Sequence, residues 1–270
     1  MRGRAMHMIK LRSLFVSDVH LGTRDAHAEQ LLDLLRHTEC DYLYLVGDIL
    51  DFWRAKSGWY WPQLNNNIVQ ILLDKAARGT RVIYIPGNHD EVMRDYAGMH
   101  FNGIDIELEV VHESADGRRL LVLHGDLFDA MVHHNRLLTH IGDAAYCALL
   151  GLNRVCNRVR RWFGQGNWSL SAYIKSHINN AVRYIDSYEQ AALREARRQG
   201  LDGIICGHIH MANLREEDGV VYANSGDWVE HCTALIETHD GSLQQLNWVR
   251  ERDSLLGDAP VGRARLASAA

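Results

Sequence analysis

The chain has 270 residues, of which 47% are hydrophobic, and a formal net charge of -5. This length is enough for one large hydrophobic core, or for a core that carries an inserted segment. The composition shows none of the bulk basicity that is typical of nucleic-acid-binding proteins. The five cysteines include no C-x-x-C pair, and such a scattered, odd-numbered set favours reduced thiols in the cytosol over a disulfide framework.

The amino-terminal residues do not match a secretory signal peptide. The start is basic, but the apolar stretch after Lys10 is interrupted by Arg12 and Ser13 and then by Asp18. No stretch of the sequence is long enough to span a membrane. Residues 257–270 are rich in Ala, Gly and Arg without periodicity, which predicts a disordered tail. We therefore expect a cytoplasmic protein.

Apolar runs typical of β-strands alternate with helical patterns along the chain. The strand-like runs are at residues 14–16, 42–46, 82–85, 120–123 and 203–206. Helical spacing of leucine and isoleucine occurs at 26–36 and 66–77. Three more strand-like runs, separated by turn signals, follow at 220–223, 233–236 and 243–248. This alternation predicts an α/β fold.

A short polar cluster follows each of the first five strand-like runs. Because strand ends meet at one edge of a sheet, their carboxylate, imidazole and amide groups should converge in a crevice. A lone histidine after a strand is usually structural, but five clusters in this order predict two metal ions in one pocket. The clusters are Asp18-Val19-His20, Gly47-Asp48, Gly87-Asn88-His89-Asp90, His124-Gly125-Asp126 and Gly207-His208-Ile209-His210.

The order of these motifs resembles the calcineurin-like metallophosphoesterase superfamily. The resemblance implies a two-sheet β-sandwich flanked by helices, and a hydrolase of phosphoester or pyrophosphate bonds. It implies that Asp48 bridges the ions, because a carboxylate can span metals about 3.5–4 Å apart. Oxygen and imidazole donors suit Mn²⁺, and also Fe²⁺ or Zn²⁺. The implied ligands are Asp18, His20, Asp48 and His210 for one ion, and Asp48, Asn88, His124 and His208 for the other.

His89 and Asp90 are the predicted catalytic residues. A protonated His89 would stabilise the transition state or donate a proton to the leaving oxygen. We expect Asp90 to orient the imidazole ring, although a simple turn cap is the alternative. Asp51 and Asp126 are expected to orient metal ligands rather than to bind metal themselves.

The interval between His124 and His208 is too long for a simple crossover. Residues 152–163 have the spacing of a basic amphipathic helix, and a second periodic stretch runs from 170 to 185. Ser187 and Gln190 form a capping-box pattern that predicts a further helix ending at Gly200. The sequence thus predicts a helical lid at 127–200, inserted between core segments 8–126 and 201–250. The lid either binds a substrate with apolar and anionic parts, or merely packs on the core with its arginines solvated.

Together with this insertion, the run Gly47-Asp48-Ile49-Leu50-Asp51-Phe52-Trp53 is similar to the UDP-2,3-diacylglucosamine diphosphatases of the lipid A pathway. These enzymes cleave the pyrophosphate of UDP-2,3-diacylglucosamine to 2,3-diacylglucosamine 1-phosphate and UMP at the inner membrane surface. The resemblance implies a phosphorylated, lipid-linked substrate and peripheral contact with an anionic membrane surface. It also implies substrate contacts from Asn88, Ser171 and Lys175.

Two departures from that group keep alternatives open. His89 stands where the group has arginine, and Met211-Ala212-Asn213 replaces its usual Arg-Pro. A related phosphoesterase acting on another phosphodiester or on a phosphomonoester is therefore the alternative. A non-catalytic binding module is disfavoured because every implied ligand is present. A nuclease is disfavoured because no basic, aromatic-lined groove is evident in the sequence.

Overall fold

The computed structural model describes residues 8–132 and 170–257. The chain forms two compact units, one comprising Met1–Asp126 and Leu193–Ala270 and the other Leu127–Ala192. The amphipathic pattern at 152–163 and the tail from 258 onward lie outside the described residues. Among the described residues, the first unit contains every strand and all the polar clusters.

A seven-stranded sheet forms half of the first unit. Its strands run in the order β12-β11-β1-β2-β3-β5-β4. The neighbours β1, β2, β3 and β5 pair in parallel. In contrast, β11, β12 and β4 pair antiparallel with their neighbours. The strands are β1 (Ile9–Val16), β2 (Thr38–Val46), β3 (Arg81–Ile85), β4 (His100–Phe101), β5 (Ile104–Ile106), β11 (Thr233–Glu237) and β12 (Leu243–Asn247).

A five-stranded sheet packs against the first sheet. Its order is β6-β7-β8-β10-β9, with β7, β8 and β10 parallel. Phe15 and Tyr44 of the first sheet are buried in one apolar cluster with Leu120, Val122 and Ile205 of the second. This shared core confirms the predicted two-sheet sandwich. The strands are β6 (Val110–Glu113), β7 (Arg119–Val122), β8 (Gly203–Cys206), β9 (Asn213–Glu217) and β10 (Val220–Asn224).

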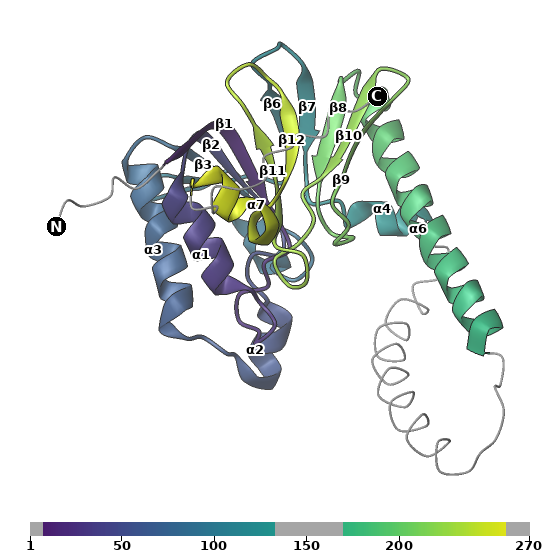
Figure 1. Ribbon diagram of the computed structural model, residues 1–270, viewed down its shortest axis with the longest axis horizontal. Helices are drawn as coiled ribbons and strands as arrows, with labels where there is room; N and C mark the ends of the chain where they lie inside the picture. Colours follow the sequence, from purple (N-terminus) through teal and green to yellow (C-terminus); the bar gives the residue numbers. More distant parts are fainter. Residues whose placement is uncertain (1–7, 133–169, 258–270) are drawn as a thin grey trace, which may run out of the picture. The chain divides into compact units, whose positions relative to one another are not determined.

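Helices cover the other face of the seven-stranded sheet. Figure 1 shows α1 (Ala28–His37) and α3 (Gln63–Ala77) lying along this face. Leucines of α1 join a cluster with Leu14 and Leu43 of the sheet, as their helical spacing predicts. The remaining helices of this unit are short, namely α2 (Phe52–Gly58), the 3₁₀ helix η1 (Glu91–Tyr96) and α7 (Trp248–Leu255).

The second unit contains α4 (Leu127–Val132) and most of α6 (Leu170–Arg198). The two helices predicted on either side of Ser187 are a single helix of 29 residues, so the predicted break is wrong. Tyr188, Ala191 and Ala192 are buried just after the capping pattern. Their apolar spacing continues the helix, and Ser187 lies on its exposed side.

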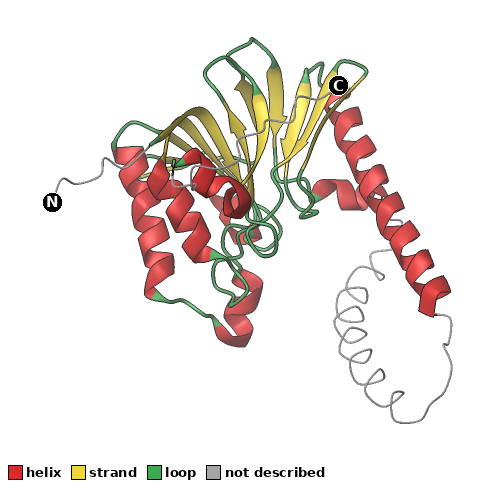
Figure 2. Cartoon of the chain, in the orientation of Figure 1, coloured by secondary structure: helices red, strands yellow, loops and turns green. Residues whose placement is uncertain are grey.

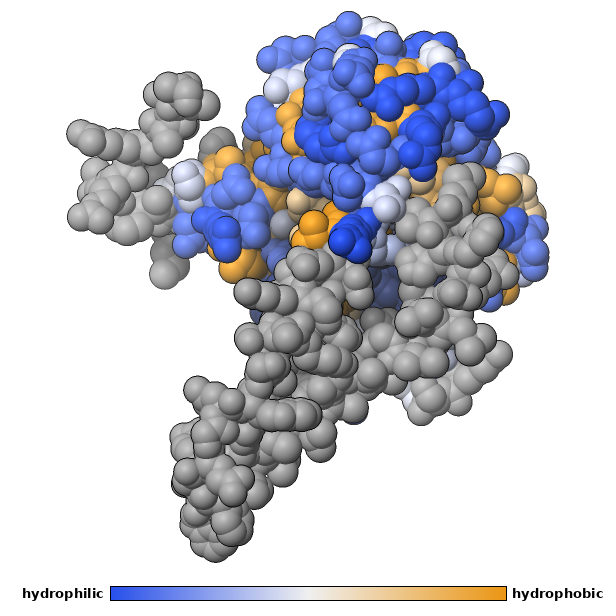
Figure 3. All heavy atoms as spheres, turned by 90° about the vertical axis from the view of Figure 1, so that its right-hand side faces the viewer, coloured by the Kyte–Doolittle hydropathy of each residue, from blue (hydrophilic) through white to orange (hydrophobic). Residues whose placement is uncertain are grey.

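No helix among the described residues is both long enough and apolar enough to cross a membrane. The face of the molecule in Figure 3 is mostly hydrophilic where residues are described, with apolar side chains in small separate areas. The apolar residues of the strands instead form the two internal clusters on either side of the seven-stranded sheet.

Candidate metal centre

The loops that follow five parallel strands carry all seven predicted metal ligands. Figure 2 shows loops gathered beyond the ends of the strands of both sheets. The predicted ligands come from the loops after β1, β2 and β3 in one sheet, and after β7 and β8 in the other. Two groups of these side chains have potential ligand atoms within 4.8 Å of one another. Motifs that are far apart in the sequence therefore lie together in one candidate site.

The first cluster consists of Asp18, His20 and His210. His210 Nε2 lies 3.3 Å from Asp18 Oδ1. The rings of His20 and His210 are stacked with their centroids 5.3 Å apart. Asp18 Oδ1 and His20 Nε2 are buried and have no hydrogen-bond partner among the described residues. Such orphaned atoms are rare in folded proteins, and here they fit the free ligand positions of a cation site.

The second cluster consists of Asp48, His124 and His208. His124 Nε2 lies 3.4 Å from Asp48 Oδ2 and 3.3 Å from the amide oxygen of Asn88. His20 of the first cluster lies 3.9 Å from the same oxygen of Asp48. Asp48 therefore stands between the clusters, as a bridging carboxylate must.

Five predicted ligands have a left-handed backbone conformation. They account for most of the eight non-glycine residues with positive φ in the described part of the chain. This conformation costs about 1–3 kcal/mol for each residue and persists only where the surrounding structure enforces it. The fold thus stores strain at the metal-ligand loops. The five are Asp18, His20, Asp48, His208 and His210, with φ between 51° and 71°.

Two motif glycines permit the close approach of the second cluster. A Cβ atom on Gly47 would lie 2.1 Å from Nδ1 of His124. A Cβ atom on Gly87 would lie 2.3 Å from Oδ1 of Asp48. Both distances are far below van der Waals contact, so only glycine fits where these loops meet.

The structure corrects the role expected of Asp90. Its buried carboxylate accepts hydrogen bonds from the backbone N–H groups of Gly87 (2.6 Å), Asp48 (3.2 Å) and Ile49 (2.9 Å), and from the hydroxyl of Tyr84. These bonds tie the loop after β3 to the loop after β2. Asp90 is thus a support of the metal loops, and the prediction that it orients the His89 ring is wrong.

Asp51 takes the place expected for Asp90. Its Oδ2 atom lies 3.1 Å from Nδ1 of His89 and 3.2 Å from Nδ1 of His20. Its Oδ1 atom accepts from the backbone N–H of Arg54 and caps α2. Although burial opposes ionisation, the bonds from His20 and Arg54 and the close contact with the His89 imidazole hold the pKa of Asp51 well below its usual range. Asp51 therefore orients one metal ligand, as expected, and also the His89 ring.

Asp126 makes a different contact from the one expected. Its carboxylate forms two hydrogen bonds with the guanidinium of Arg94, at 2.8 and 2.9 Å. No described contact joins it directly to a metal ligand. Sequence reasoning did not single out Arg94, which no motif includes.

The electrostatics of the centre favour bound cations. Burial lowers the pKa of His124, but the carboxylates of Asp48, Asp18 and Asp126 outweigh burial and raise it to about 10. The neighbouring carboxylates therefore favour the protonated form of the His124 imidazole. Divalent ions would neutralise the same negative charge, so the donor set fits a dinuclear metal site.

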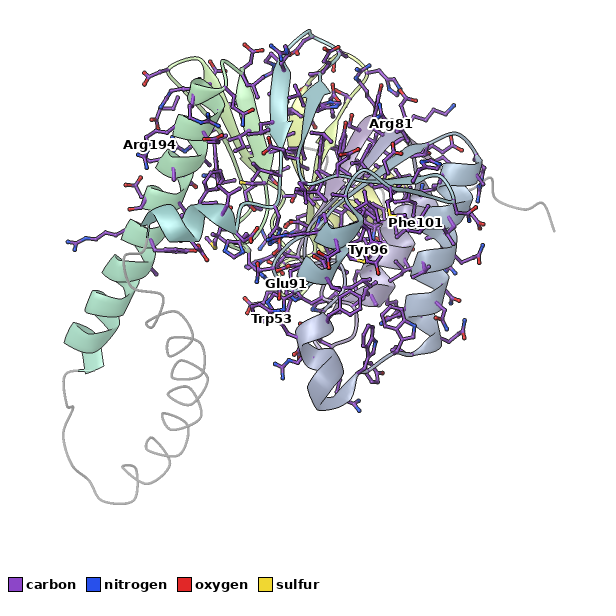
Figure 4. All side chains as sticks on the ribbon, turned by 180° about the vertical axis from the view of Figure 1, so that it is seen from behind. Trp53, Arg81, Glu91, Tyr96, Phe101 and Arg194 are labelled. Atoms are coloured by element: carbon purple, nitrogen blue, oxygen red, sulfur yellow. The ribbon has the colours of Figure 1, made fainter. Side chains whose placement is uncertain are left out.

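An aromatic side chain borders the site beside His89. The rings of Trp53 and His89 are stacked with their centroids 4.0 Å apart, and Trp53 is 44% exposed. The backbone N–H of Phe52 donates to the carbonyl of His89 at 3.1 Å, which fixes the start of α2 against this loop. Figure 4 labels Trp53 of α2 and Glu91, the residue that opens η1 after the His89 loop.

Two of the three predicted substrate contacts belong to the second unit. Ser171 and Lys175 belong to α6, in the second unit. Their role in substrate binding stays a prediction.

The family model described as calcineurin-like phosphoesterase matches residues 11–212. This chain belongs to the calcineurin-like phosphoesterase family. The match spans all five motifs, from Asp18 to His210, and confirms the predicted fold class. As a member of this family, the protein is a phosphoester-hydrolysing enzyme with candidate groups for divalent metal.

Individual relatives share one name. The phosphoesterase is 27% identical over 251 residues to the UDP-2,3-diacylglucosamine hydrolase of Neisseria gonorrhoeae, covering 86% of this chain and 96% of that one. It is 28% identical over 246 residues to the protein of the same name from Vibrio atlanticus, covering 84% and 94%. Among solved structures, a phosphoesterase from E. coli overlaps with a TM-score of 0.41 at 16% identity, covering 87% and 98%.

Proposed function

We propose that this phosphoesterase hydrolyses the pyrophosphate bond of UDP-2,3-diacylglucosamine, giving 2,3-diacylglucosamine 1-phosphate and UMP. The names of its relatives, which align over most of their length, support this substrate. The observation that carries the chemistry is the pair of clusters with Asp48 between them. Two divalent ions, with Mn²⁺ first and Fe²⁺ or Zn²⁺ as alternatives, are proposed as the cofactors.

The proposed ligands follow the two clusters. Asp18, His20 and His210 hold one ion, and His124, His208 and Asn88 hold the other, with Asp48 shared. When bound, such ions activate water and neutralise charge on the phosphoryl oxygens. The buried carboxylates contribute the negative charge that retains both cations, and the strained loops fix the geometry before binding.

His89 is the proposed general acid. Its Nδ1 atom is directed at Asp51, so Nε2 is the atom left to meet a phosphoryl oxygen or the leaving group. Asp51 and the Trp53 ring fix the orientation of the imidazole from two sides. In this orientation His89 stabilises the transition state by a hydrogen bond or donates a proton to the departing oxygen.

The lid and the site of action belong to the same proposal. Ser171 and Lys175 are proposed to contact the lipid-linked substrate, and the protein is proposed to work in the cytoplasm at the inner membrane, without a nucleic-acid partner. The basic, amphipathic pattern at 152–163 supports contact with an anionic lipid surface.

A substrate panel tests the proposal. Purified protein with Mn²⁺ is incubated with UDP-2,3-diacylglucosamine, cyclic nucleotides and aryl phosphodiesters. We expect the highest kcat/KM for UDP-2,3-diacylglucosamine, with release of UMP. Turnover of aryl or cyclic phosphodiesters alone would favour the alternative substrate class, to which the histidine at position 89 and Met211 in place of arginine also point.

A further inference from the structure

The loop that follows β10 carries no predicted metal ligand, yet it is one of the most buried segments of the chain. Asn224, Ser225, Asp227 and Trp228 are all inaccessible to solvent. β10 pairs in parallel with β8, and Asn224 lies opposite Cys206, the last residue before the Gly207-His208-Ile209-His210 motif. The loop therefore lies directly beside the ligands that follow β8.

The side chain of Asn224 holds the turn of that motif. Its Nδ2 atom donates to the carbonyl of Gly207 at 2.7 Å, and its Oδ1 atom accepts from the backbone N–H of Gly226 at 3.0 Å. The same Gly207 carbonyl accepts from the N–H of Ile209 at 2.9 Å. Two hydrogen bonds therefore hold this carbonyl in place. It belongs to the turn in which His208 and His210 have left-handed backbone conformations.

The same loop also holds the segment that carries Asp18. The hydroxyls of Ser225 and Ser17 are 2.7 Å apart, and the Ser17 hydroxyl donates to the carbonyl of Gly226 at 3.0 Å. The backbone N–H of Trp228 donates to the carbonyl of Asp18 at 3.0 Å. One buried loop is thus bonded to both segments that supply the first cluster with Asp18 and His210.

This support is separate from the one that Asp90 provides. Asp90 bonds the loops after β2 and β3, which carry Asp48 and Asn88. The loop after β10 instead bonds the loops after β1 and β8. Because left-handed residues keep their conformation only when their surroundings enforce it, removing one support should release its own ligands and leave the others in place.

We infer that Asn224 and the Ser17–Ser225 pair are positioning residues, which hold Asp18, His208 and His210 in their left-handed conformations and so set metal affinity chiefly at the first cluster. The inference rests on the proposed dinuclear metal site. A loop that only stabilised the fold would change the free energy of unfolding and leave metal affinity unaltered, and this difference is measurable.

The test compares Asn224→Leu with Thr233→Val in the full-length protein. Leucine is close to asparagine in size but can neither donate to Gly207 nor accept from Gly226. Thr233→Val removes the bond from the N–H of Asp227 to the threonine hydroxyl, a bond of the same loop that involves neither Ser17 nor Gly207. Each protein is stripped with a chelator, its metal-free melting temperature is recorded, and Mn²⁺ binding is followed by calorimetry.

We expect wild type to bind two Mn²⁺ ions, and Asn224→Leu to bind one of them about 10-fold or more weakly. Thr233→Val should keep both affinities within about 3-fold of wild type while losing a similar amount of thermal stability. If Asn224→Leu does not fold, Ser225→Ala is measured in its place and should weaken the same binding event. It removes the bonds of the Ser225 hydroxyl to Ser17 and to the carbonyl of Cys206.

The outcomes separate the two proposals. Wild-type affinities in a folded Asn224→Leu or Ser225→Ala protein would overturn the positioning role and leave the dinuclear site standing. Equal weakening by Thr233→Val would also overturn it, because loop stability would then explain the loss. A wild-type protein that binds no Mn²⁺ would overturn both the metal site and the inference.

Discussion

At the scale of single residues, His89 is held on three sides. Its ring lies against Trp53 and makes an edge contact with His20 at 4.5 Å between centroids, while Asp51 faces its Nδ1 atom. The bond from His89 to the second cluster comes from its backbone N–H, which donates to Asp48 Oδ1 at 2.8 Å and is kept when the side chain is changed. The catalytic step and the metal site can therefore be separated by mutation.

We predict that His89→Asn lowers kcat by about 100-fold or more, because the general acid or charge stabiliser is lost. Mn²⁺ stoichiometry should stay at the wild-type value. Steady-state kinetics and metal analysis on the same preparation check this. A loss of metal in proportion to activity would show instead that His89 supports the ligands.

A second residue-scale prediction contrasts two carboxylates. Asp51→Asn should lower kcat because Asp51 holds the His89 ring, with little change in melting temperature. Asp90→Asn should lower stability by about 1–3 kcal/mol, since an amide NH₂ would face backbone N–H donors that now share a buried carboxylate. Chemical denaturation and kcat, measured for both variants, give opposite rankings if these roles are right. Identical rankings would contradict the reassignment.

Residue types at strand ends were sufficient to predict which side chains gather in the two candidate metal-binding clusters, but not the contacts of Asp51 and Asp90. Both aspartates stand in motifs, and the choice between them depends on which carboxylate faces an imidazole and which faces backbone N–H groups. That is set by the loop conformation, which the sequence does not display. The support from Asn224 was missed for the same reason, because it acts through backbone carbonyls.

At the scale of elements, the long apolar runs were predicted well and the short polar strands were not. β4 and β6 have two and four residues and contain histidine or glutamate, so no run of apolar residues signals them. Such strands form because the backbone N–H and C=O groups of the neighbouring strand, β5 or β7, pair with them. α6 shows the reverse case, in which continued apolar spacing outweighed a local capping pattern.

A buried carboxylate joins the two sheets. Glu237 of β11 accepts hydrogen bonds from Ser114 (2.7 Å) and from the N–H of Ala115 (2.8 Å), which follow β6 in the other sheet. His112 of β6 lies 2.8 Å from the same carboxylate, and Ser13 of β1 donates to it. Burial opposes the charged form, but these partners lower the pKa of Glu237 to about 2.

We predict that this contact makes stability fall in acid. A depressed carboxyl pKa stabilises the fold fully above the unfolded value of about 4.5, and the contribution is lost as pH falls from there toward 2. The loss is on the order of 3 kcal/mol. Glu237→Gln should therefore be less stable than wild type at pH 7 and show a smaller decrease between pH 5 and pH 3 in urea denaturation. Glu29→Gln, at an exposed position of α1, is the matched control.

At the scale of the whole molecule, the candidate metal centre is a second connection between the sheets. Its ligands come from loops after β1, β2 and β3 of one sheet and after β7 and β8 of the other. The carboxylates hold a proton on His124 in the absence of metal, with a pKa of about 10. Metal binding must displace that proton, so Mn²⁺ affinity should increase with pH between 6 and 8. An affinity that is independent of pH in calorimetry would contradict this linkage.

Metal removal should therefore destabilise the fold that contains both sheets. A ligand that binds only the native state stabilises it by about 2.7 kcal/mol at a free concentration 100 times its Kd. For a domain of this size, that corresponds to a shift of roughly 5–11 °C in the melting temperature. We expect a chelator to lower the melting temperature by at least this amount and Mn²⁺ to restore it in a saturable way. Asp48→Asn, which lacks the shared anion between the clusters, should melt at the same temperature with and without Mn²⁺. A shift of equal size in that variant would show that Mn²⁺ stabilises the protein at some other place, and the bridging role of Asp48 would then be lost.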